Sequence, residues 1–412
     1  MPTSGSILGN SVRRVEDPRI LHGGARYFDD LPVEGLLHVA FVRSTMAHAA
    51  IPSVDVAEAQ GMPGVVAVYT ADTLPLEPIK GFVMLPDTIK RPPLARDIVR
   101  FVGDIVAVVV AETRTQAVDA AELVIVDYDP LPTVVDSEQA LGEDAVVLHP
   151  EHGSNLAIEF NFGEDPEILA DADIVVRGRF ENQRLAAAPM EANGIVVEPD
   201  GERITVHVPS QNVFAVRDPM ANALGMEPAH VRVIAPAVGG GFGAKMAFYP
   251  EFAITGAAAR ALGRPVKWTE TRSENMVSMH HGRAQVQHVE LGLKRDGTMT
   301  ALRARIVQDA GAYPSTGAFL PFLTRMMGQG VYRLPKVEVN SRSAITNTTP
   351  TGAYRGAGRP EATAMLERIV DMAAVELGMD PIELRKKNFI PPEDFPLSTT
   401  TCLLYTSDAA DE

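Results

Sequence analysis

Apolar runs and helix-like segments alternate over the first third of the chain. Residues 20–136 hold three runs rich in Val, Ile and Leu, typical of strands, and two segments typical of short helices. The expected strands are Leu36–Ser44, Gly64–Thr70 and Val102–Ala111, and the expected helices are Val54–Met62 and Arg114–Val124. Repeated β-α-β units with short joints indicate an α/β or α+β domain.

This first region offers no candidate catalytic residue. A proline-rich excursion, Leu74–Pro93, interrupts the strand and helix pattern. His48 and Arg43 lie beside an expected strand end and are interpreted as structural. The polar residues 1–19 are expected to form an irregular arm, and the domain that follows is predicted to span residues 20–145.

Longer strand-like segments begin after a polar joint, His149–Asn161, which marks the predicted domain boundary. They turn at Asp200-Gly201 and at Asp296-Gly297, and such two-residue turns are typical of β-hairpins. A helix is expected at Arg359–Leu377. This mixture predicts a second, larger α+β domain over residues 146–401, because a doubly wound sheet requires further parallel βαβ units.

The second region contains a glycine-rich segment, AVGGGFGAK, at Ala237–Lys245, called the glycine loop below. It lies between a strand-like run, Val231–Val238, and an expected helix, Met246–Leu262. Glycine has no Cβ, so the backbone can adopt positive φ and approach a ligand closely with its N–H groups pointing outward. At the start of a helix, such a loop suits an anionic or polar cofactor.

The residues of the glycine loop leave several interpretations open. The first is a plain connection that binds no ligand. The second is a dinucleotide site, since Gly239-x-Gly241-x-x-Ala244 fits the loose G-x-G-x-x-G/A pattern and Glu270 follows at a distance suited to a ribose contact. A phosphate-binding P-loop is excluded, because Ala244 replaces its last glycine and Met246 replaces its Ser or Thr. The third interpretation depends on the motifs elsewhere in the chain.

Composition excludes several classes of protein. The chain has 412 residues and is 46% hydrophobic, which is enough for two or more cores, and its net charge of −16 argues against a nucleic-acid partner. The apolar run Ile105–Ala111 is too short to span a bilayer, and the first residues show no apolar signal region. A cytoplasmic protein is therefore expected. The lone cysteine, Cys402, excludes an iron–sulfur cluster held by this chain alone.

Four motifs together carry a resemblance to a known family. Their order and spacing are similar to those of the molybdenum-binding subunit of the xanthine dehydrogenase/aldehyde oxidase family, and most like large subunits of the aerobic carbon monoxide dehydrogenase type. The motifs are RLAAAPMEANG (Arg184–Gly194), PSQNVFAVRD (Pro209–Asp218), VGGGFGAK (Val238–Lys245) and TGAYRGAGRPE (Thr351–Glu361). The resemblance covers about residues 7–401. It implies an α+β fold, with an N-terminal a/b hammerhead domain followed by the first part of a molybdopterin-binding domain.

The resemblance also implies roles for particular residues. Gln211 and Arg355 match catalytic positions, with the Gln211 amide donating to an oxo ligand and Arg355 supplying a cation on the substrate side. No protein side chain ligates molybdenum in this family. The substrate-facing residues are expected to be Phe242, Tyr354 and Arg355. The cofactor-binding residues are expected to be Gly239, Gly240, Gly241, Phe242, Gly243, Gln211, Ala353, Arg355, Gly356 and Ala357.

The implied reaction is oxidative hydroxylation of an aldehyde, heterocycle or similar small substrate, with water as the oxygen source. The implied cofactor is molybdopterin with molybdenum, expected in its cytosine dinucleotide form. Electrons are expected to pass to a small Fe-S subunit and a medium FAD subunit in a dimer of heterotrimers. Two alternatives stay open: an NAD- or FAD-binding dehydrogenase that uses the glycine loop, and a non-catalytic assembly subunit.

Two departures from the family pattern limit what the resemblance implies. Members that oxidise carbon monoxide carry a copper-binding cysteine where this chain has Gly356, so no copper site is expected. The family is roughly twice as long, and its catalytic glutamate lies in the second half, so the chain as given is expected to be inactive. Residues Cys402–Glu412 are similar to a translated sequencing adapter and are interpreted as an artefact.

Overall fold

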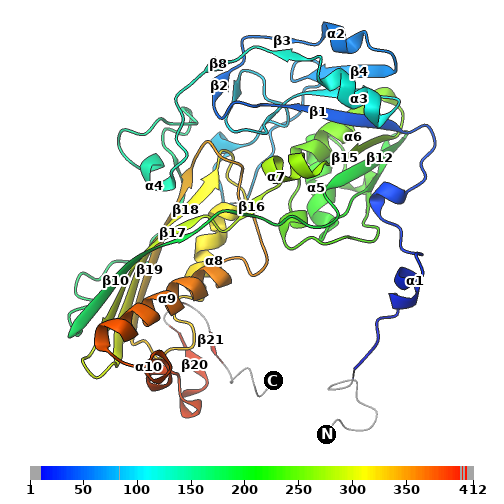
Figure 1. Cartoon of the computed structure of the whole chain (residues 1–412). Coiled ribbons are helices and arrows are strands. Elements are labelled where there is room, and N and C mark those ends of the chain that lie inside the picture. The colour runs from blue at the N-terminus through cyan, green and yellow to red at the C-terminus, as the bar shows by residue number, and fades with distance from the viewer. Residues whose placement is uncertain (1–10, 83, 400, 402–403, 406–412) are drawn as a thin grey trace.

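Two large sheets organise the computed structural model, which describes residues 11–82, 84–399, 401 and 404–405 (Figure 1). The first sheet has the strand order β14-β13-β12-β15-β1-β6-β4, and the second has the order β10-β17-β18-β19-β9. The strands of the first sheet are β14 (Val231–Ile234), β13 (Arg203–His207), β12 (Gly194–Asp200), β15 (Val266–Thr269), β1 (Leu37–Arg43), β6 (Ile105–Ala111) and β4 (Val65–Thr70). Those of the second are β10 (Ile174–Asn182), β17 (Gln285–Leu293), β18 (Met299–Gly311), β19 (Lys336–Ile345) and β9 (Leu156–Phe160). The predicted α+β class is confirmed.

The three strands expected in the first region are all present as β1, β4 and β6. Every residue of β6 is buried, as its unbroken apolar sequence requires. Helix α3 (Arg114–Ala121) packs on β1 and β6, and its first turn is capped by the Thr113 hydroxyl, which accepts from the Gln116 N–H. The expected helix at Val54–Met62 is wrong in its first half, because Val54–Asp55 forms strand β3 and helix α2 covers only Ala57–Gln60.

The first sheet continues across the predicted domain boundary. Strand β1 pairs in parallel with β15, where Leu37 lies opposite Val266 and His38 opposite Lys267. Arg43 at the end of β1 forms ion pairs with Glu251 at 2.8 Å and Glu274 at 3.1 Å. The interpretation of Arg43 as structural is supported by these two ion pairs with the second region, and its guanidinium also donates to the Gly103 carbonyl of the first region at 3.3 Å.

The second sheet contains one of the predicted hairpins and carries the predicted long helix. Asp296-Gly297 turns β17 into β18, while Asp200-Gly201 turns β12 into β13 in the first sheet. Helix α9 spans Arg359–Leu377, as expected, and packs on β10 and β17 (Figure 1). The polar joint His149–Asn161 is not a plain linker, because Leu156–Phe160 within it forms β9 and pairs with β19.

The segments on either side of the glycine loop differ from their predicted bounds. Strand β14 ends at Ile234 rather than Val238, because Pro236 has no N–H for a ladder hydrogen bond. Helix α6 begins at Pro250 rather than Met246, with the proline in the first helical turn where its missing N–H has no cost. A single 3-10 turn, Ala244–Met246, lies between them.

Smaller elements complete the described part of the chain. The helices are α1 (Asp17–Leu21), α4 (Ser137–Ala140), α5 (Phe214–Ala223), α7 (Arg272–Ser278), α8 (Leu320–Met326) and α10 (Pro381–Asn388). The short strands are β2 (Ala49–Ala50), β5 (Ile98–Val99), β7 (Ile125–Val126), β8 (Asp129–Pro130), β11 (Leu185–Ala186), β16 (His281–Gly282), β20 (Leu397–Ser398) and β21 (Leu404–Tyr405). No helix within these described residues is long and apolar enough to cross a bilayer. Apart from Leu404–Tyr405, the predicted artefact, Cys402–Glu412, lies outside the described residues.

Candidate active site around two adjoining loops

The glycine loop has the backbone conformation that its glycines predict. Gly240 and Gly243 both have φ of 96°, and Phe242 between them has φ of 52°, which is uncommon for a residue with a side chain. A Cβ at Gly243 would lie 2.7 Å from the carbonyl oxygen of Ala353. Glycine is therefore required at this position, because the loop packs directly against a second backbone segment.

A buried ion pair holds the glycine loop from behind. The Lys245 ammonium donates to the Glu191 carboxylate at 2.8 Å and to the Glu191 carbonyl at 2.9 Å. The same carboxylate oxygen accepts from the Gly239 N–H at 2.8 Å, and the Glu191 N–H donates to the Gly239 carbonyl at 3.1 Å. Burial lowers the pKa of Lys245, while the bonded Glu191 carboxylate acts in the opposite direction. Both ends of the loop are thus tied to residue 191.

The Gln211 side chain is oriented by the glycine loop. Its amide oxygen accepts from the Gly243 N–H at 2.8 Å, and its own backbone N–H donates to the Lys245 carbonyl at 3.0 Å. A backbone N–H can only donate, so the oxygen of the amide must face Gly243 and the NH₂ group must face away. The NH₂ group is left to donate to a ligand in front of the loop.

The segment Thr351–Glu361, called the arginine loop below, adjoins the glycine loop. The Arg355 N–H donates to the Phe242 carbonyl at 2.9 Å and joins the two loops directly. Arg283 fixes the arginine loop from the other side, because its guanidinium donates to the carbonyls of Tyr354 at 3.0 Å and Arg355 at 2.7 Å. The same guanidinium lies 4.6 Å from the centre of the Tyr354 ring and pairs with buried Glu361.

Several donors at this junction are free to meet a ligand. Among the described residues, the N–H groups of Gly240, Gly241 and Phe242 have no hydrogen-bond partner. The Arg355 side chain is exposed and forms no hydrogen bond or ion pair with the described residues. Gly356 at the tip of the arginine loop is also exposed, with φ of 92°. The structure thus brings the predicted cofactor residues of both loops together.

Glu270 does not take the place that the dinucleotide interpretation gave it. The side chain is 4% exposed, and one carboxylate oxygen accepts from the Asn193 N–H and from the Asn275 side chain, both at 2.7 Å. Burial raises the pKa of Glu270 to about 7. Moreover, α6 begins seven residues after Gly243, and β15 joins the far side of β12 instead of extending a parallel sheet beyond β14. The structure therefore gives the dinucleotide interpretation no support.

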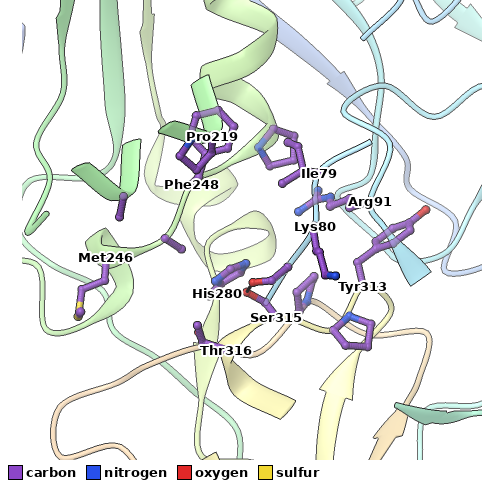
Figure 2. Close-up of a pocket in the computed structure, with 16 residues that line it drawn as sticks. Ile79, Lys80, Arg91, Pro219, Met246, Phe248, His280, Tyr313, Ser315 and Thr316 are labelled. Atoms are coloured by element: carbon purple, nitrogen blue, oxygen red, sulfur yellow. Dashed lines mark hydrogen bonds between the residues drawn. The ribbon is translucent and has the colours of Figure 1, made fainter. Parts of the chain in front are cut away.

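A cavity of about 230 Å³ lies beside the glycine loop, and sequence reasoning missed it. Met246, which follows Lys245 directly, lines this cavity (Figure 2). Ala215, four residues after Gln211, lines it as well. Its opposite wall is Ile79–Gly81 and Arg91, from the excursion that appeared to hold no chemistry. The predicted substrate residues Phe242, Tyr354 and Arg355 are not among its lining residues, and their substrate role stays a prediction. The sequence did not identify the excursion as part of a cavity, because the residues that line the other side are distant in sequence.

Comparison with known protein families matches most of the chain. Residues 148–389 match the model of the molybdopterin cofactor-binding domain, and residues 22–132 match the a/b hammerhead domain of aldehyde oxidase and xanthine dehydrogenase. The gamma subunit of the 6-hydroxypseudooxynicotine dehydrogenase complex of Paenarthrobacter nicotinovorans is 37% identical, and the match covers 94% of this chain and 50% of that subunit.

Solved structures have the same fold. Quinoline 2-oxidoreductase from Pseudomonas putida 86 is 36% identical with a TM-score of 0.91, and the match covers 97% of this chain and 52% of that one. The chain spans about half the length of these relatives. The nicotinate dehydrogenase large molybdopterin subunit of Eubacterium barkeri is shorter: it is 29% identical, and the match covers 93% of this chain and 89% of that subunit.

Proposed function

The chain belongs to the molybdopterin-binding large subunits of the xanthine dehydrogenase and aldehyde oxidase family, and we propose that it builds part of the active site of a molybdenum hydroxylase. The observation that carries this proposal is the junction of the two loops. Three backbone N–H groups without a partner among the described residues and the oriented amide of Gln211 belong to this junction, and Lys245 and Glu191 hold the glycine loop in place.

The residues present fit a molybdopterin cofactor. Such a cofactor offers pterin, dithiolate and phosphate edges, which accept hydrogen bonds and need neutral donors more than charged ones. Gly240, Gly241 and Phe242 supply those donors on a backbone without bulky side chains, and Gly356 leaves the tip of the arginine loop open. These residues would hold the group together with Gly239, Gly243, Ala353 and Ala357.

When bound, the molybdenum centre supplies a two-electron oxidation that adds oxygen from water to the substrate. Gln211 would donate an N–H to the bound group, and the hydrogen bond from Gly243 orients its amide within the chain itself. Arg355 presents a positive charge on a backbone anchored by Arg283 and Phe242, so charge that develops on a substrate oxygen is stabilised there. The substrate class is an aldehyde, a nitrogen heterocycle or a similar small molecule.

We place this chain in a complex with a small Fe-S subunit and a medium FAD subunit in the cytoplasm. Relatives named as a large chain or as a complex subunit support the partnership. The form of the cofactor in this proposal is the cytosine dinucleotide. A non-catalytic assembly role is disfavoured, because a docking subunit would not need an oriented amide and three backbone donors left without partners at one loop.

Cofactor analysis of the full-length protein, purified with its partner subunits, tests the proposal. We expect molybdenum and extracted pterin at about one per chain. Recovery of stoichiometric NAD without molybdenum would refute the proposal, and so would a complex that contains neither pterin nor metal after expression in cells that make the cofactor.

A substitution at Gln211 tests its role separately. Gln211→Glu keeps the oxygen that accepts from Gly243 but removes the NH₂ donor. Molybdenum content should stay unchanged, while kcat should fall roughly 10²–10³-fold, as for the loss of one donor to a developing oxyanion. The matched control is Asn212→Asp, at the neighbouring exposed amide whose oxygen caps the backbone at Phe214 and Ala215. Equal kcat in Gln211→Glu and wild type would contradict the assignment.

A further inference from the structure

The cavity beside the glycine loop has one apolar side and one cationic side. In Figure 2, Met246 and Phe248 lie on one side, while Lys80 and Arg91 lie on the other near Tyr313. At about 230 Å³ the cavity is smaller than the roughly 300–1,000 Å³ of sites for drug-sized ligands, so it suits a small molecule. Its lining residues include lysine and arginine but no aspartate or glutamate.

Arg91 lines this cavity and has side-chain N–H groups without hydrogen-bond partners among the described residues. Its side chain is 8% exposed, and neither Nε nor Nη2 has a hydrogen-bond partner within the described part of the chain. The guanidinium is packed between aromatic rings, with its carbon 5.1 Å from the centre of Phe101 and 5.6 Å from that of Tyr313. A buried guanidinium with unmet donors is costly unless an acceptor is supplied.

The nearest carboxylate does not supply that acceptor. Asp104 lies 3.8 Å from Arg91 Nη2, which is beyond hydrogen-bond distance. The other Asp104 oxygen already accepts from the Arg100 N–H at 3.1 Å and from the Tyr313 hydroxyl at 3.2 Å. Burial raises the pKa of Asp104, which further weakens it as a counter-ion. The positive charge of Arg91 is therefore incompletely compensated by the described residues.

The remaining polar groups of the cavity agree with this charge. Lys80 adds a second cation at the mouth, where it is 41% exposed and pairs with Asp87 at 3.1 Å. His280 is buried, and burial lowers its pKa to about 3, so the ring is neutral at physiological pH. Ser315 and Thr316 add hydroxyl groups to the lining. The described lining residues include no carboxylate that would repel an anion.

The cationic wall is closely packed where it meets the second region. The Arg91 backbone exchanges two hydrogen bonds with Ile79, at 2.7 and 2.9 Å, which fixes the base of the excursion. Gly81 packs so closely on the next wall that a Cβ there would lie 2.0 Å from the carbonyl oxygen of Pro314. The backbone of Arg91 is thus anchored by hydrogen bonds within the chain itself.

We propose that this cavity selects substrates carrying a carboxylate or a similar small anionic group, with Arg91 as the residue that recognises the anion and Lys80 as a secondary contact. Calling the bound molecule a substrate rests on the proposed hydroxylase function, whereas the preference for an anion does not. The apolar wall formed by Phe248, Pro219 and Met246 takes the body of the molecule, and the guanidinium takes its charged end.

Direct binding of two probes of the same shape tests the proposal. The purified complex is titrated calorimetrically with benzoate and with benzamide, which differ only in the anionic group. We expect benzoate to bind at least tenfold more tightly, which is about 1.4 kcal/mol. Arg91→Gln should abolish most of this ratio, Arg91→Lys should keep part of it, and Lys80→Gln should reduce it two- to fivefold.

Control measurements separate recognition from folding. Arg96→Gln removes a nearby arginine that bonds to the Ala71 carbonyl outside the cavity, and it should leave the ratio unchanged. Equal binding of the two probes by wild type would overturn the proposal without any variant. It would also be overturned if Arg91→Gln melted at the wild-type temperature and kept the full ratio. Probe binding does not require turnover. A complex that contains no molybdenum would therefore refute the proposed function, while the ratio of benzoate to benzamide affinity would still test the anion preference.

Discussion

The buried pair Lys245–Glu191 should control the local stability of the glycine loop. Lys245 has a side chain that is 0% exposed, and Glu191 has one that is 13% exposed, so solvent screens their interaction little. Glu191→Gln keeps the size of the side chain but removes the charge that the lysine and the Gly239 N–H share. Lys245→Met removes the cation and keeps an unbranched apolar chain in the same space.

The expected magnitude follows from what each variant leaves behind. Removing one partner of a buried pair typically costs about 3–5 kcal/mol, because the other charge stays buried. Lys245 would keep its bond to the carbonyl of residue 191, so we expect about 3 kcal/mol for Glu191→Gln. Glu191 is slightly exposed and would keep its Gly239 donor, so about 2 kcal/mol is expected for Lys245→Met. The double variant should cost less than the sum by at least ~1 kcal/mol.

Hydrogen–deuterium exchange resolves this effect at the loop itself, which matters because a chain of this size need not unfold in one step. A local loss of about 3 kcal/mol lowers the protection of the hydrogen-bonded amides in this segment roughly hundredfold, namely those of Gly239, Gly243, Ala244 and Met246. Peptides from β17 and β18, which do not contact the pair, serve as the internal reference. Protection within threefold of wild type in Glu191→Gln, or additive effects in the double variant, would show that the pair does not hold the loop.

Two further predictions concern Glu270 and Gly356. The folded-state pKa of Glu270 is raised to about 7 from 4.5, so the folded protein binds the proton more tightly and stability should fall as pH rises from about 4.5 through 7. Each pKa unit is about 1.4 kcal/mol, so the stability of wild type should fall by roughly 2–3 kcal/mol over this range relative to Glu270→Gln. If the urea midpoints of the two proteins changed in parallel from pH 5 to 8, the linkage would be contradicted. Copper loading of the full-length complex should yield no carbon monoxide oxidation, because Gly356 offers no thiolate. Copper-dependent turnover of carbon monoxide would refute this, and a cysteine introduced there would be strained by φ of 92° and by Pro360, 2.7 Å from its Cβ.

Local features of the fold were predictable where one segment carries its own signal. The bounds of α9 match the expected Arg359–Leu377 because its apolar spacing is helical and Gly378 follows it in the left-handed region. The hairpin turns were marked by Asp-Gly pairs, and the positive φ values of Gly240 and Gly243 followed from the glycines themselves. The start of α6 was placed too early because Ala247, Phe248 and Tyr249 continue the apolar run after Met246, whereas Pro250 marks the first turn of the helix.

What the sequence could not show is which distant segments share a surface. The pairing of β1 with β15 depends on only two residue pairs, and neither strand's own pattern identifies its neighbour. Yet this pairing and the ion pairs of Arg43 with Glu251 and Glu274 join the first region to the second. As a result, Arg91 and Met246 line the same cavity. An arginine between prolines in an irregular excursion has no pattern that distinguishes recognition from packing. The structure supplies the missing information. It shows unmet donors on Arg91, a neutral His280 and described lining residues without a carboxylate around one cavity. The cavity therefore belongs to neither predicted domain alone, and substitutions on either side of the boundary should alter the same ligand preference.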